Sequence, residues 1–285
     1  MDYLFEQGKT MESAPNRLVE DARQAPVKNA FRLGVEFMDR NRSLAAMTMG
    51  VFFLLSLLEM VPVLGIAATI AVGVFAQAVQ IYVGRAFYEA SGIDAYVAAA
   101  ESAGLKELLT RYQAPAFGAW LGWFTLSFVF MLLFVVFLFA GGFDLSALDQ
   151  QSLQNEADIY ATVLLVLEAG TPVLLFALLL SYVYPIAQGR VIRSDTFGEA
   201  FRAVFSIFSP SVWASAMNGA YFMYVFYFSL ALIGIAVLVF ATMMLLVLIP
   251  ILGAILIFVW MIFLVYVFML VFGVANTIAR EIAEG

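Results

Sequence analysis

Long apolar runs dominate this chain of 285 residues. A helix that crosses a bilayer needs about 20 consecutive, mostly apolar residues. Runs of this kind recur along the sequence, and shorter segments between them carry most of the charges. Only 12% of the residues are charged, against about 25% in a soluble domain, so lipid is the solvent for much of the chain. The runs predict six membrane-spanning helices, at 44–60, 62–88, 115–141, 160–188, 211–247 and 250–278.

The basic residues predict how these spans are oriented. With six spans, all 14 Lys and Arg fall on the side of the membrane that carries both termini. Basic residues in short loops stay in the cytoplasm, so we expect a bacterial inner membrane protein with both termini cytoplasmic. A seventh span within 211–278 would move only Arg280 outside, so charge alone leaves that alternative open. The outer side then carries acids without a base, namely Glu59, Asp144, Asp149, Glu156, Asp158 and Glu168.

Two short motifs indicate an internal repeat. The sequences VPVLG (61–65) and IPILG (249–253) each interrupt a pair of apolar runs. An Ala-Phe-Arg triplet precedes each motif, at 30–32 and 200–202. Proline suits the first turn of a helix and glycine suits a tight reversal, so both motifs predict hairpin turns with almost no polar loop. The residues in this structural role are Pro62, Gly65, Pro250 and Gly253.

Amphipathic stretches precede the predicted hairpins. In 27–42 and 194–210, aromatic and aliphatic residues recur at helical spacing. Such stretches predict helices that lie in the membrane interface, here on the cytoplasmic side. A weaker stretch at 93–112 favours two short helices around Gly104.

The simplest division of the chain is three similar units. A cytoplasmic N-terminal segment (1–26) precedes units at 27–88, 93–188 and 194–281, and the second unit contains an outer loop at 142–159. Each unit ends near a basic residue at its cytoplasmic exit, namely Arg85, Arg190 and Arg280. We therefore expect an all-α integral membrane protein. Its six transmembrane helices form three pseudo-repeated hairpins, each preceded by a cytoplasmic interfacial amphipathic helix.

The chain combines an interfacial F-x-x-A-F helix with a hairpin broken by [VI]-P-[VI]-L-G. In this combination it resembles the six-helix membrane domain attached to some glycerophosphodiester phosphodiesterases, and related uncharacterised bacterial membrane families, including Yip1-like ones. The resemblance covers about 27–88 and 195–281. It implies an integral membrane accessory domain and brings no catalytic residues to this chain.

Glu168 is an acidic residue within a predicted span. A carboxylate inside the membrane is a functional candidate by default, as a proton or cation site. In the alternative interpretation, Thr171 caps the true span, Pro172 begins it, and Glu168 ends a short interfacial helix on the outer surface. The sequence leaves both interpretations open.

Two larger groups of polar residues are candidates for a transport path. The outer acids either form a vestibule that attracts cations, or they predominate on that side only because the topology keeps basic residues on the other side. Polar side chains in the cytoplasmic halves of the spans either line a cavity open to the cytoplasm or hydrogen-bond between helices and form an interfacial tyrosine belt. This second group contains Gln77, Gln80, Tyr184, Asn218, Tyr221 and Asn276.

Several kinds of chemistry are excluded by what the sequence lacks. It contains no cysteine and no histidine, which removes disulfides, Cys/His zinc sites and histidine-ligated haem. It contains no P-loop, dinucleotide-binding or nucleophile-elbow motif. A net charge of −7 argues against nucleic acid as a partner. We therefore expect no enzyme, no cofactor and no metal site.

The function that remains is a non-catalytic membrane scaffold or accessory subunit. We expect it to bind lipids and partner proteins through its Phe-rich faces, and to form homo-oligomers. The alternative is a channel or transporter with an acidic outer vestibule and a cytoplasm-facing polar layer. A continuous polar cavity at the centre would favour transport, whereas a centre filled with apolar side chains would favour the scaffold.

Overall fold

The computed structural model describes residues 17–141, 156–249 and 251–285. Within these ranges the chain is helical and contains no strand. Six of the described helices are long and apolar enough to cross a membrane, which confirms the predicted all-α, six-span fold class. These are α3 (Arg42–Glu59), α4 (Pro62–Glu89), α6 (Gln113–Ala140), α7 (Glu156–Ile192), α10 (Gly219–Val247) and α11 (Leu252–Glu284).

Short helices connect the long ones or precede them. They are α1 (Arg17–Gln24), α2 (Pro26–Arg40), α5 (Ile93–Thr110), α8 (Phe197–Phe205), the 3-10 turn η4 (Ser206–Phe208) and α9 (Pro210–Ala216). The prediction of two short helices around Gly104 was wrong, because α5 passes through that glycine without a break. Glycine costs a helix only about 1 kcal/mol, and the packing of α5 against α4 offsets this.

The long helices form three hairpins, α3–α4, α6–α7 and α10–α11. In the described part of 211–278, two long helices are present, so a third span in that region is ruled out. The predicted start of the fifth span at residue 211 was wrong, however. Residues 210–216 form the separate helix α9, and the Asn218 side chain caps α10 by accepting a hydrogen bond from the Tyr221 backbone N–H at 2.6 Å.

Each amphipathic helix packs on a hairpin of another unit. Helix α2 packs on α11, α5 packs on α4, and α8 packs mainly on α6 and also on α7. The second helices α4, α7 and α11 in turn contact one another. The three units therefore close into a ring, in which the short helix of each unit holds the unit before it.

This ring packing buries one face of α2, formed by Ala30, Leu33 and Phe37. Val35, on another part of the helix surface, is exposed. A Cβ atom on Gly34 would lie 3.1 Å from backbone atoms of Val271 in α11. Because α2 approaches α11 so closely, this buried face meets protein, and the interfacial position of the helix stays a prediction.

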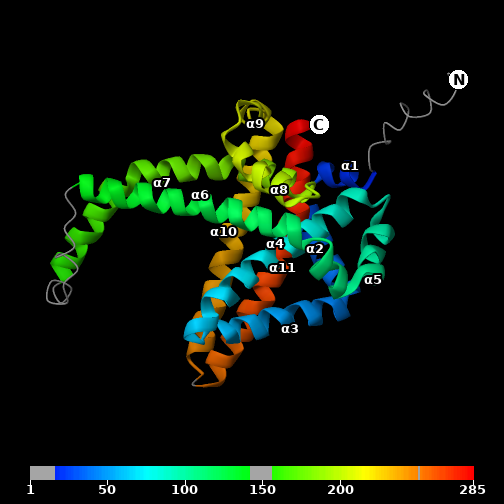
Figure 1. Cartoon of the computed structure of the whole chain (residues 1–285), viewed down its shortest axis with the longest axis horizontal. Helices are drawn as coiled ribbons and strands as arrows, with labels where there is room; N and C mark the ends of the chain where they lie inside the picture. Colours follow the sequence, from blue (N-terminus) through cyan, green and yellow to red (C-terminus); the bar gives the residue numbers. More distant parts are fainter. Residues whose placement is uncertain (1–16, 142–155, 250) are drawn as a thin grey trace, which may run out of the picture.

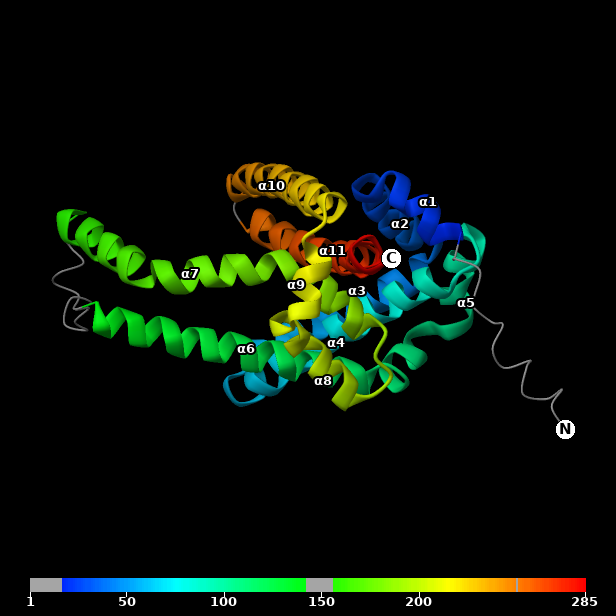
Figure 2. The same cartoon turned by 90° about the horizontal axis from the view of Figure 1, so that it is seen from above.

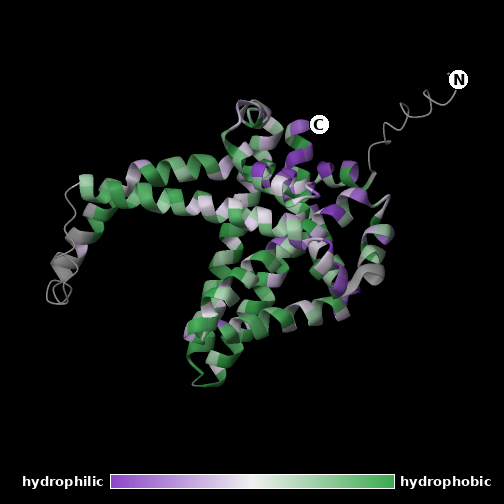
Figure 3. Cartoon of the chain, viewed as in Figure 1, coloured by the Kyte–Doolittle hydropathy of each residue, from purple (hydrophilic) through white to green (hydrophobic). Residues whose placement is uncertain are grey.

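The hairpins diverge as they leave the region where the units meet. In Figure 1, α6–α7 extends to the left, whereas α10–α11 extends downward, and Figure 2 shows from above that α6–α7 reaches further to the left than α10–α11. Figure 3 shows that the diverging parts are hydrophobic and that hydrophilic residues gather where the short helices and the C-terminal end of α11 meet. The meeting region is therefore the polar part of the described structure.

Candidate functional site

The second helices of the three hairpins meet at small residues. A Cβ atom on Gly84 would lie 2.9 Å from the carbonyl oxygen of Gly273, and one on Gly189 would lie 2.6 Å from that of Asn276. A Cβ atom on Gly273 would lie 2.9 Å from the carbonyl oxygen of Gln80. Small residues allow helix backbones to approach closely, and here they leave no room even for a methyl group. The side chains around these contacts are apolar and buried: Val83, Ile186, Ala187, Val191, Val271, Val274, Ala275 and Ile278.

A glutamine cluster joins the first two hairpins. The fully buried amide of Gln188 in α7 donates to the side-chain oxygens of Gln77 at 2.8 Å and Gln80 at 3.2 Å, both in α4. Its own side-chain oxygen accepts a hydrogen bond of 2.8 Å from the indole N–H of Trp123 in α6. Both amide hydrogens of Gln188 and its oxygen are thus engaged, as a polar group in an apolar interior requires.

Trp123 was missed by the sequence interpretation. An aromatic residue in an apolar span gives no indication of whether it faces lipid or a polar partner. The structure shows that its ring also contacts the ring of Tyr184 in a tilted arrangement, with the centroids 4.8 Å apart.

Asn218, Tyr221 and Tyr224 form a second group where α10 begins. Besides capping α10, Asn218 donates to the carbonyl oxygen of Ile282 in α11 at 3.3 Å. The hydroxyl of Tyr221 donates to the carbonyl oxygen of Tyr182 in α7 at 2.6 Å. The hydroxyl of Tyr224 donates to a backbone carbonyl of α11 at 2.9 Å. These bonds tie α10 to the second helices of two hairpins.

Asn276 differs from the other members of the predicted polar layer. Its side chain is 2% exposed, and its amide nitrogen has no hydrogen-bond partner in the described structure. It lines a cavity of about 190 Å³ between α7, α10 and α11, together with Tyr184. The six predicted residues therefore fall into three adjoining groups: the glutamine cluster, Asn218 and Tyr221 at the start of α10, and this cavity, which Tyr224 also lines.

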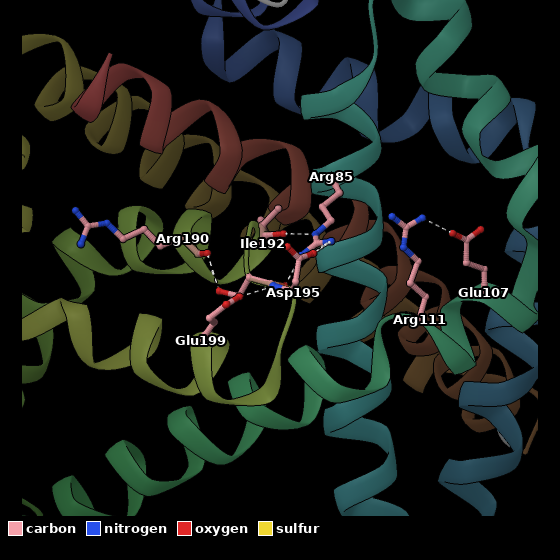
Figure 4. Close-up of polar contacts among 8 residues, drawn as sticks. Arg85, Glu107, Arg111, Arg190, Ile192, Asp195 and Glu199 are labelled. Carbon is pink, nitrogen blue, oxygen red and sulfur yellow. Dashed lines mark hydrogen bonds and ion pairs between the residues drawn. The ribbon is translucent and has the colours of Figure 1, made fainter. Parts of the chain in front are cut away.

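Arg85 holds the C-terminal end of α7, as Figure 4 shows. This side chain is buried, and its Nε donates to the carbonyl oxygen of Ile192 at 2.8 Å. One guanidinium nitrogen donates to the carbonyl oxygen of Ser194 and the other to the Asp195 carboxylate at 2.7 Å. The last carbonyls of a helix lack partners within the helix, and a cation there is favoured by the helix dipole. The sequence indicated Arg85 only as a basic residue at the exit of its unit.

Ion pairs fasten the end of α7 to the end of α11. Arg190 lies 2.6 Å from the Glu284 carboxylate, which also accepts from Arg280 at 2.7 Å. Arg193 pairs with Glu281. Burial and the neighbouring Arg280 lower the pKa of Arg193 from its ordinary value. A guanidinium remains charged despite such a shift, so the cluster acts as a permanent electrostatic contact between two units.

The predicted outer acids do not form a site in the described residues. Glu59 is exposed at the end of α3. Glu156 and Asp158 lie in the first turn of α7, and Asp144 and Asp149 lie outside the described residues. No three acidic side chains in the described part of the chain come close enough to hold a metal ion.

Glu168 is exposed on α7, two residues before the apolar span that begins at Gly170. The prediction that Thr171 caps a new helix was wrong, because α7 continues through it and its hydroxyl donates back to the carbonyl oxygen of Leu167. Pro172 lies inside the helix and cannot donate to the Glu168 carbonyl. Figure 2 shows α7 bent in its N-terminal half, where this proline lies.

The structure places the predicted turn residues at tight reversals. Pro62 begins α4, and a Cβ atom on Gly65 would lie 2.7 Å from the carbonyl oxygen of Glu59 at the end of α3. In the second turn, a Cβ atom on Gly253 would lie 2.0 Å from a carbonyl oxygen of α10. Ile251 has a φ of 59°, which strains a β-branched residue. Pro250 lies outside the described residues.

No known protein family, curated protein or solved structure matches this chain. The resemblance to membrane domains attached to glycerophosphodiester phosphodiesterases therefore stays a prediction. Function has to be inferred from the geometry of the hairpins and of the polar groups between them.

Proposed function

We propose that this chain is a non-catalytic integral membrane scaffold or accessory subunit of a bacterial inner membrane, with both termini in the cytoplasm. Its hairpins bind lipids and partner proteins through their exposed apolar faces, and the chain forms homo-oligomers. The main observation in support is the closed packing of α4, α7 and α11 where the three hairpins meet.

A solute path through the centre would have to pass between these three helices. Gly84 and Gly189 bring their backbones into contact there, and the fully buried side chains Val274 and Ile278 fill the space beside them. The buried amide of Gln188 bonds to other side chains. Polar groups at the centre thus act between helices, which supports the scaffold.

The outer faces of the hairpins supply the binding surface. None of the most apolar 18-residue stretch of α10 is buried within the chain. Val237, Leu238 and Phe240 of this helix each expose more than half of their surface. Apolar surface of this extent requires lipid or a partner to cover it. Divergent hairpins therefore offer separate faces to the membrane and to other subunits.

The alternative of a channel or transporter rests on one feature of the polar region. Tyr184 and Ser181 line both the 190 Å³ cavity and a second cavity of about 340 Å³ between α6 and α7. A transport path would need these adjoining spaces to open to both sides of the membrane. The following experiment separates the two functions.

The chain contains no cysteine, so a single introduced thiol reports on one position without background. We would compare Val274→Cys, at the packed centre, with Gly198→Cys in α8, whose Cβ would meet nothing within 4 Å. In native membranes, a small charged thiol reagent is expected to label residue 198 and to leave residue 274 unlabelled. Reconstituted protein is expected to add no ion flux to liposomes. Labelling at 274 together with a flux would replace the scaffold by a channel.

Homo-oligomer formation has its own test. Leu238→Cys places a thiol on the exposed face of α10, and oxidation in membranes is expected to link two copies or to link the chain to a partner. Val274→Cys serves as the buried control that should not crosslink. If Leu238→Cys stays monomeric under oxidation while protein remains folded, this face contacts lipid alone.

A further inference from the structure

The cavity beside Asn276 is built as a small polar site in an apolar environment. Its lining carries no charged side chain, and its polar members include Ser181, Tyr184 and Ser229 beside the buried Asn276. The Asn276 amide nitrogen is buried without a hydrogen-bond partner. An unpaired donor in such surroundings destabilises the fold, so an occupant that supplies an acceptor would stabilise it.

The wall of the cavity that α7 forms lacks one of the backbone hydrogen bonds of a regular helix. Pro185 of α7 lines the cavity and lies inside the helix. Because proline has no N–H, it cannot donate to the carbonyl of Ser181 one turn earlier. The cavity is thus bordered by a free amide donor on α11 and a carbonyl on α7 that lacks its usual helical donor.

The position of the cavity along the helices limits the kind of occupant. Asn276 lies four residues before Arg280 in α11, which places it about 6 Å further from the charged end of that helix. Arg280 and the adjoining Arg190 are paired with Glu284, and the Nη1 of Arg280 has no further partner in the described structure. Just inside the charged boundary of a membrane lie the hydroxyl and ester groups of glycerolipids, between headgroups and hydrocarbon.

A neighbouring space can accept the apolar part of such an occupant. The cavity of about 340 Å³ between α6 and α7 shares Ser181 and Tyr184 with the first one. Its other walls are mainly apolar and include Leu126, Phe130 and Leu180. An acyl chain can therefore leave the polar cavity past Tyr184 along an apolar surface.

We propose that the cavity between α7, α10 and α11 binds an uncharged glycerolipid, whose ester carbonyl or hydroxyl accepts a hydrogen bond from Asn276. This inference specifies the lipid binding of the proposed scaffold and rests on the insertion of the chain in a membrane. The thiol accessibility of residue 274 does not depend on this lipid, so each proposal can fail without the other.

The test uses the full chain in detergent and native mass spectrometry. Dioctanoylglycerol is the uncharged probe, and dioctanoylphosphatidylglycerol is the matched probe with a phosphate. The wild-type chain is expected to bind one dioctanoylglycerol more tightly than the charged lipid. Loss of one buried hydrogen bond predicts that Asn276→Leu weakens this binding about tenfold.

Two further variants separate a lost site from a disturbed fold. Ser229→Phe fills the cavity from α10, where the residue is exposed, and is expected to weaken binding with Asn276 intact. Thr242→Val alters an exposed hydroxyl that bonds to its own helix and should bind like the wild type. The proposal is overturned if the wild type binds neither probe, if it holds the charged lipid equally well, or if Asn276→Leu and Ser229→Phe bind dioctanoylglycerol normally.

Discussion

Replacing Arg85 by methionine would test whether one side chain of α4 holds the C-terminal end of α7. Methionine keeps the apolar stem but removes every donor of the guanidinium. The carbonyls of Ile192 and Ser194 would lose their bonds to this side chain, and both residues are buried. A buried acceptor without a partner costs about 1–3 kcal/mol, so the two together predict a loss of about 2–6 kcal/mol in the free energy of unfolding.

The ion pair to Asp195 contributes much less to this loss. The Asp195 side chain is 77% exposed, and pairs that involve solvated charges are worth about 0–1 kcal/mol. Asp195→Asn is therefore the matched control, with an expected loss below about 1 kcal/mol. Arg85 therefore stabilises the fold through its bonds to the carbonyls at the end of α7, and not through the ion pair with Asp195.

Both variants can be measured by unfolding the purified protein in mixed micelles with increasing denaturing detergent, followed by tryptophan fluorescence. The expected order of stability is wild type, Asp195→Asn, then Arg85→Met well below both. Equal losses in the two variants would assign the effect to the ion pair. A loss below about 1 kcal/mol in Arg85→Met would refute the proposed role of the buried carbonyls.

Further predictions concern the packed centre, the glutamine cluster and a buried tyrosine. Gly84→Leu should lose at least about 1–3 kcal/mol through overpacking, whereas Gly234→Leu, whose Cβ would meet nothing within 4 Å, should unfold like the wild type. Gln188→Leu leaves three polar side chains without this partner, and should lose about 1–3 kcal/mol and shift the emission of Trp123. Burial raises the pKa of Tyr96 in α5 well above its ordinary value. The unfolded chain then releases this proton above about pH 10 while the folded chain keeps it, so stability should fall as pH rises beyond that point. Tyr96→Phe should flatten this decline in unfolding measurements across pH 9–11, about the pKa of a free tyrosine, and an unchanged slope would contradict the assignment to Tyr96.

The sequence identified polar residues that make contacts between helices, but it did not identify the partners of each residue. Gln77, Gln80, Asn218 and Tyr221 were predicted as one layer, and the structure engages each of them in a contact between helices. Their separation into different groups was not predictable, because spacing along one helix does not say which neighbouring helix a side chain meets. Trp123 was missed for the same reason.

The number and type of the long helices were determined by the sequence alone, because run length and apolar composition decide whether a helix can cross a bilayer. Local chemistry also determined features such as the start of α4 at Pro62. The ring of units, the closed glycine contacts and the role of Arg85 were decided only by tertiary structure. A helix that is apolar on every side has no stripe to mark its buried face, so the partners of α4, α7 and α11 follow from three-dimensional packing and not from any local pattern.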